Sequence, residues 1–128
     1  MPEPVFLNLA EVQYLHEQSI IRFGGTHGAR DIGLAQSAMA SARNTWNYGG
    51  GDWFDTAAAY AFHLAQAQAF LDGNKRTGAA AALAFLRRNG FPVIIDDGSL
   101  ADAMVAIAER RLDKPGLAAV LRRLTPPE

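Results

Sequence analysis

The side chains best suited to chemistry gather in one ten-residue segment, Gln68 to Thr77, which reads QAFLDGNKRT. The flanking residues predict helices on both sides, so Lys75 and Arg76 fall in the first turn of the second helix. A helix start exposes unpaired backbone N–H groups and carries a partial positive charge. Gly73 lets the backbone come close to a ligand. Together these features predict an anion site suited to phosphates.

The two cations stand at the end of a helix where acidic residues are normally preferred. A sequence that breaks this rule between two apolar helices indicates a ligand. Asp72 could hold a magnesium ion that bridges the phosphates, and Asn74 could bond a phosphate or a metal-bound water. The alternative is ordinary turn chemistry, because Asp-Gly-Asn is common in turns and basic residues on helices are usually solvated.

Glycines separate alanine-rich blocks, a pattern that predicts helices joined by turns. Side chains that can accept from the first turn mark four helix starts, at Asn8, Asp31, Asp52 and Ser99. Gly90 is expected as the C-cap of the fourth helix, and Pro115 fits the first turn of the sixth. The expected helices are 9–23, 32–42, 53–70, 74–89, one capped by Ser99 and ending near 111, and one ending near 124.

The third and fourth helices are expected to be buried. Apolar residues lie on nearly every side of 53–70, and residues 78–86 carry no charge and contain five alanines. We therefore predict an all-α bundle of six helices around this central hairpin, in one domain spanning 1–128. Residues 43–52 are predicted to form a loop or short hairpin, and 91–95 a short extended piece.

Composition narrows the functional classes. The chain has 128 residues, 49% of them hydrophobic, and a formal net charge of −1. This balance disfavours binding to nucleic acid or to a membrane surface. The absence of cysteine excludes thiolate metal sites and cysteine nucleophiles. No signal peptide and no membrane-spanning run is visible, so the expectation is a cytoplasmic protein.

The segment Phe70-x-Asp72-Gly73-Asn74-Lys75-Arg76-Thr77 resembles the signature of the Fic/Doc family. It is most similar to the Doc (death-on-curing) branch, whose motif is His-x-Phe-x-Asp/Asn-Gly/Ala-Asn-Lys-Arg-Thr. Residues 16–25, 28–34 and 86–90 resemble further parts of that branch, so the resemblance runs from about residue 8 to 124.

The resemblance implies a helical toxin of a bacterial toxin–antitoxin pair. Doc-type members transfer the terminal phosphoryl group of ATP to a threonine of elongation factor Tu, which blocks translation. ATP and Mg²⁺ are the implied cofactors, and an antitoxin and elongation factor Tu are the implied partners.

The resemblance also implies roles for single residues. Asp72 is the implied metal ligand and a catalytic residue, and Lys75 is implied in catalysis. The implied nucleotide-binding residues are Gly73, Asn74, Lys75, Arg76, Thr77 and Arg22. Residues 43–52 occupy the place of the family's flap, which holds the target peptide.

Gln68 stands where the family has its catalytic histidine, the general base that takes the proton of the attacking hydroxyl. An amide has no comparable basicity, and loss of a positioned base typically costs on the order of 10²–10⁴ in rate. His63 is a poor substitute for that base, because it lies five residues before Gln68 on the same expected helix. Five residues turn a helix by about 500° and advance it about 7.5 Å, so the two side chains point in different directions from different heights. His16, His27 and His63 are each expected to be structural. The chain is therefore expected to be inactive or impaired, and the sequence leaves open whether the glutamine is natural or engineered.

Two alternative functions remain. The first is transfer of AMP. AMP-transferring Fic proteins typically have glycine at the position of Lys75 and a further arginine downstream, whereas this chain has its alanine run at that later position. The other alternative is a domain that binds a nucleotide or a partner without catalysis.

Overall fold

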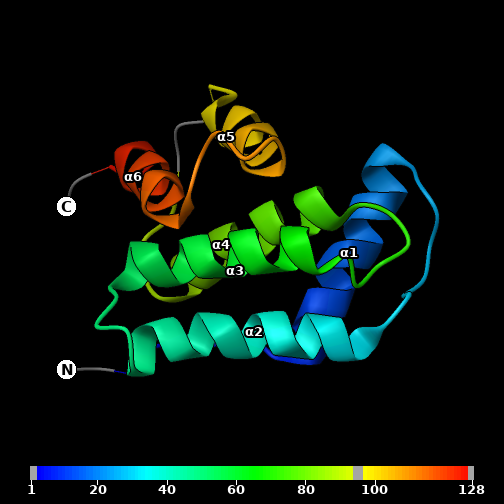
Figure 1. Ribbon diagram of the computed structural model, residues 1–128, viewed down its shortest axis with the longest axis horizontal. Helices are drawn as coiled ribbons and strands as arrows, with labels where there is room; N and C mark the ends of the chain where they lie inside the picture. Colours follow the sequence, from blue (N-terminus) through cyan, green and yellow to red (C-terminus); the bar gives the residue numbers. More distant parts are fainter. Residues whose placement is uncertain (1–2, 94–96, 127–128) are drawn as a thin grey trace.

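Six helices follow one another along the part of the chain that the structure describes. The computed structural model describes residues 3–93 and 97–126. The helices in order are α1 (Leu9–Phe23), α2 (Ile32–Asn47), α3 (Trp53–Ala67), α4 (Asn74–Arg88), α5 (Ser99–Ala108) and α6 (Lys114–Leu124). Within the described residues the only β pairing is one isolated bridge. The predicted all-α fold of six helices is confirmed (Figure 1).

Polar caps fix the starts of the first three helices. The Asn8 side chain accepts from the Glu11 N–H at 2.9 Å, and the Glu11 carboxylate accepts from the Asn8 N–H at 3.0 Å. Asp52 caps α3 with the same reciprocal pair of bonds to Asp55, and Asp31 caps α2 by accepting from the Gly33 N–H. These caps satisfy backbone donors that have no partner inside the helix, so the predicted starts are confirmed.

Helix α3 is the centre of the molecule, in contact with α2, α4, α5 and α6 (Figure 1). Eight of its fifteen residues are buried, five of them alanines. At Gly78 of α4, an added Cβ would lie 2.6 Å from the Ala61 carbonyl oxygen. Only a glycine permits this approach of the two helices, which confirms the predicted buried hairpin of the third and fourth helices.

The predicted loop at 43–52 is wrong in its first half, because α2 continues to Asn47. Trp46 packs against Trp53 with ring centroids 4.7 Å apart, and this contact favours the longer helix. The link is reduced to 48–52, and it lies at the opposite end of α3 from Gln68. The fifteen residues of α3 span about 22 Å, so the flap position expected for 43–52 is also wrong.

Other helix ends differ by one to three residues. Helix α3 ends at Ala67, because Gln68 adopts the left-handed conformation with φ 54°. Helix α4 ends at Arg88, with Asn89 rather than Gly90 as its C-cap. Ser99 does not cap α5 but is its first residue, after Gly98, and its hydroxyl accepts from Arg123 at 2.7 Å.

Helix α5 also ends earlier than predicted, at Ala108 rather than near 111. Pro115 lies in the first turn of α6 as expected, and α6 ends at Leu124. Of the predicted extended piece, 91–93 is non-helical and 94–95 lies outside the described residues. In the part of the chain that the structure describes, no helix has the length and apolar character needed to span a membrane.

Candidate active site

Asn74 shapes the loop between α3 and α4. Its side chain is 7% exposed. The amide oxygen accepts from the Phe70 N–H at 3.1 Å, and the amide nitrogen donates to the Phe70 carbonyl at 3.0 Å. Both bonds are buried, where an unpaired amide group would be costly. Asn74 therefore fixes the turn, and its predicted contact with a phosphate stays a prediction.

His16 ties α1 to the same loop. Its Nε2 lies 2.8 Å from the Asp72 carbonyl oxygen, and its ring stacks on Phe70 at 3.9 Å between centroids. A carbonyl accepts only, so Nε2 carries the proton in this bond. The side chain is 3% exposed. The structural role expected for His16 is confirmed, but its contact with the Asp72 backbone was not expected.

The connection between α1 and α2 runs alongside the loop between α3 and α4, which is called the motif loop below. Arg30 N–H donates to the Ala69 carbonyl at 2.7 Å, and Leu71 N–H donates to the Gly28 carbonyl at 3.1 Å. Ala29 and Phe70 form the isolated bridge. These bonds join segments about forty residues apart in sequence, so the motif loop is held on two sides, by α1 and by residues 24–31.

Asp72 and Gly25 meet closely in this arrangement. One carboxylate oxygen of Asp72 accepts from the Thr26 N–H at 3.3 Å, and the other accepts from the Gly73 N–H at 3.0 Å. A Cβ on Gly25 would lie 2.7 Å from the carboxylate, and Gly25 has φ 119°. The positive φ therefore favours glycine at position 25, and a larger residue there would also have to displace the Asp72 carboxylate.

A cavity of about 380 Å³ opens at the start of α4. It is lined by Gln68, Leu71, Asp72, Gly73, Asn74, Lys75 and Arg76. Lys75 is exposed, and no described residue forms an ion pair with it. Gln68 also lines the cavity, and its amide nitrogen donates to the Ala65 carbonyl at 3.0 Å. The structure thus brings the predicted residues Gln68, Asp72 and Lys75 to one cavity.

Asp72 is the sole acid among the described residues that line this cavity. The described residues contain no group of three or more histidines and carboxylates that could hold a metal ion. Magnesium commonly takes one or two carboxylates and completes its shell with phosphate oxygens and water. A single exposed carboxylate at a cavity of about 380 Å³ therefore fits magnesium that is bound together with a nucleotide, and not magnesium bound by the protein alone.

Three residues predicted to contact the nucleotide either have another partner or do not line the cavity. Arg76 donates to the Gly24 carbonyl at 2.9 Å and stacks on Phe23, so its side chain braces α1. Thr77 is fully buried and does not line the cavity. Arg22 is exposed on the last turn of α1 and is not among the lining residues. Their roles toward a nucleotide stay predictions.

The two remaining histidines lie elsewhere. His27 is an exposed side chain 2.9 Å from Glu17. His63 lies 3.1 Å from the Lys114 ammonium, and partial burial together with that positive charge lowers the pKa of its imidazole. Neither lines the cavity that holds Gln68, in agreement with the expectation that neither replaces the missing base.

A helical hairpin with Gly73, Lys75 and Arg76 at its turn agrees with the resemblance to the Fic/Doc family, and residues 6–86 match the Fic/DOC family. The chain belongs to this family. It is 37% identical over 115 residues to protein kinase doc of Escherichia phage P1, covering 89% of this chain and 90% of that protein. It is also 39% identical over 119 residues to toxin Doc of Mycolicibacterium smegmatis, covering 85% of this chain and 91% of that protein.

Proposed function

We propose that the chain is a Doc-type toxin built on an ATP-dependent protein kinase, with its catalysis impaired at Gln68. Its relatives are a protein kinase doc and a toxin Doc that it matches over most of their length. The observation that carries the proposal is the cavity at the start of α4, where Gln68, Asp72 and Lys75 meet. The proposed acceptor is a threonine of elongation factor Tu.

Each side chain has a distinct proposed task. The α4 N-terminus and Lys75 hold the phosphates, because both present positive charge to the cavity. Asp72 holds magnesium, which neutralises charge on the phosphates when it is bound. Gln68 orients the acceptor hydroxyl but cannot take its proton at neutral pH, so turnover is slow.

Phosphoryl transfer is favoured over AMP transfer by two positions. Lys75 occupies the place where AMP-transferring relatives typically have glycine. Their downstream arginine falls in the alanine run of α4, residues 79–82. Binding without catalysis is the alternative that Gln68 itself favours.

The proposal is tested first by calorimetry of the unaltered chain with ATP and magnesium. We expect heat of binding, because the groups that hold phosphate do not depend on Gln68. A folded chain that releases no heat at millimolar ATP would contradict the nucleotide site and, with it, the kinase proposal.

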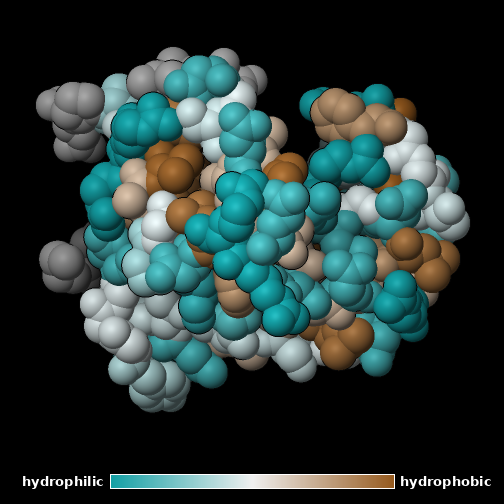
Figure 2. All heavy atoms as spheres, turned by 45° about the horizontal axis from the view of Figure 1, so that its top comes forward, coloured by the Kyte–Doolittle hydropathy of each residue, from teal (hydrophilic) through white to brown (hydrophobic). Residues whose placement is uncertain are grey.

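An antitoxin segment is proposed to dock between α4 and α5. A cavity of about 360 Å³ there is lined mostly by apolar side chains, with Lys75 and Arg76 at its edge. Figure 2 shows that one face of the molecule is hollowed by a notch. An amphipathic helix with acidic residues at one end fits both features. Co-expression with the neighbouring gene's product is expected to give a stable complex, and failure to co-purify counts against the pairing.

A further inference from the structure

Helix α5 ends in a Schellman turn that has an arginine at its left-handed position. The Arg111 N–H donates to the Ala106 carbonyl at 2.7 Å, and the Arg110 N–H donates to the Ile107 carbonyl at 3.0 Å. Arg110 has φ 61°. Glycine is the usual residue at this position, because it has no Cβ to strain the left-handed conformation.

Helix α4 ends in the same turn and uses glycine. There the Phe91 N–H donates to the Leu86 carbonyl at 2.8 Å, the Gly90 N–H donates to the Arg87 carbonyl at 3.2 Å, and Gly90 has φ 92°. Among the described residues, Arg110 and Gln68 are the two non-glycine residues with positive φ. Gln68 lines the candidate active site, and strained residues concentrate at functional sites. Arg110 is therefore a candidate functional residue that acts through its side chain.

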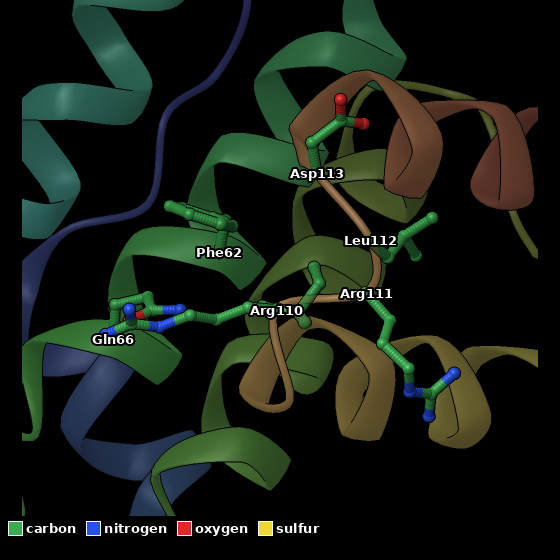
Figure 3. A pocket seen from close by; sticks show the side chains of 7 residues that line it. Phe62, Gln66, Arg110, Arg111, Leu112 and Asp113 are labelled. Carbon is green, nitrogen blue, oxygen red and sulfur yellow. The ribbon is translucent and has the colours of Figure 1, made fainter.

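The Arg110 side chain extends toward Gln66 at a second cavity, of about 630 Å³ (Figure 3). Phe62, Ile107 and Leu112 give this cavity an apolar part. Its volume lies in the range of ligand sites, about 300–1,000 Å³. Arg110 is thus placed where a bound group would meet both a guanidinium and apolar side chains.

Among the basic groups that line this cavity, Arg110 is the one without a paired acid in the described part of the chain. The Asp113 carboxylate accepts from the Gly116 N–H at 2.8 Å as the cap of α6. Arg111 points away from Gln66 and pairs with Glu109 (Figure 3). Lys114 lies 3.1 Å from the His63 ring and has no acidic partner among the described residues. Within the described residues Arg110 forms no ion pair, so an incoming carboxylate would find it available.

We propose that this second cavity docks an acidic segment of the protein substrate, with a carboxylate on Arg110 and an adjacent apolar side chain against Phe62 and Leu112. Gln66 precedes Gln68 by two residues, so their Cα atoms are at most about 7 Å apart. A segment held there lies beside the position that orients the acceptor hydroxyl. The inference rests on the proposed kinase function, since it names a docking site for that reaction's protein substrate.

The first test uses Arg110→Gly and a fluorescein-labelled peptide of four Glu-Leu repeats. Fluorescence anisotropy is expected to show binding to the unaltered chain and affinity at least about tenfold lower for the variant, because a charge-assisted hydrogen bond is lost. The variant's Tm is expected to be equal or higher, because glycine relieves the left-handed strain. Arg87→Ala, which removes an exposed arginine elsewhere, controls for net charge and is expected to leave affinity within about twofold.

Gln66→Glu gives a second variant that does not alter the turn. Its carboxylate would occupy Arg110 and repel an acidic ligand, so the same loss of peptide affinity is expected. The inference is overturned if the unaltered chain does not bind the peptide. It is also overturned if both variants bind the peptide as tightly as the unaltered chain does. This readout needs neither ATP nor turnover.

A kinetic measurement separates this inference from the proposed function. In a Gln68→His background, Arg110→Gly is expected to raise KM for elongation factor Tu several-fold and leave kcat unchanged, because it removes binding that the ground state and the transition state share. Active transfer with an unchanged KM would overturn the docking site and leave the kinase function standing. Absence of ATP binding would contradict the kinase function, while the peptide measurement would still decide whether the cavity binds acidic segments.

Discussion

Replacing Gln68 with histidine is expected to raise the rate of phosphoryl transfer by about 10²–10⁴, the usual contribution of a positioned base. Position 68 lines the same cavity as Asp72 and Lys75, so an imidazole there would stand beside the phosphate site. Its ordinary pKa of about 6.5 suits proton transfer at neutral pH. The left-handed backbone at position 68 does not oppose the change, because histidine is enriched among residues with positive φ.

The measurement follows label from ATP to elongation factor Tu. Label at the terminal phosphate is expected on the protein, and growth is expected to stop when Gln68→His is expressed without an antitoxin. Gln68→Asn is the control, because it keeps an amide and supplies no base. Transfer only from ATP labelled at the phosphate next to the ribose would indicate AMP transfer instead. If ATP binds but neither label is transferred, the non-catalytic function becomes the better explanation.

The fold was predictable from the sequence where its determinants are local. Asn8, Asp31 and Asp52 start helices because each can accept from the first turn that follows it. The buried hairpin was visible in the alanine-rich composition of 53–70 and 78–86. The helix ends at Gln68 and Arg110 were not predictable, since both residues take a conformation for which glycine is the usual signal.

The basic residues of the sequence predicted a candidate anion site, but they did not predict the contacts that hold its loop. His16 reaches the Asp72 carbonyl over 56 positions of sequence, and Gly25 makes room for the Asp72 carboxylate. Such pairings depend on how α1 packs on α4, which no local pattern states. Residues 16–25 resemble the family's sequence, but they carry no local pattern that predicts these contacts. One available signal was Gly24-Gly25 followed by Gly28, since clustered glycines mark a segment that another backbone approaches closely.

Asp72 and Lys75 are expected to contribute to nucleotide affinity in ways that magnesium separates. Lys75→Ala is expected to weaken ATP binding by about 10- to 100-fold with or without magnesium, because it removes a charge-assisted contact to phosphate. Asp72→Asn is expected to weaken binding chiefly when magnesium is present. The amide can still accept from the Gly73 N–H, as the carboxylate does, so the loop keeps its shape while the charge that attracts the metal is lost.

Calorimetry of both variants, each with magnesium and with a chelator, checks this pattern. Lys114→Ala is the matched control, because Lys75 and Lys114 are the two lysines of the chain and Lys114 lies by His63, away from this cavity. Circular dichroism on each variant verifies the fold. If ATP affinity is the same for the unaltered chain, Lys75→Ala and Asp72→Asn, the nucleotide does not bind at the start of α4. A loss for Asp72→Asn that is as large in chelator as in magnesium would instead mean that the carboxylate acts by holding the Thr26 and Gly73 backbone, without a metal.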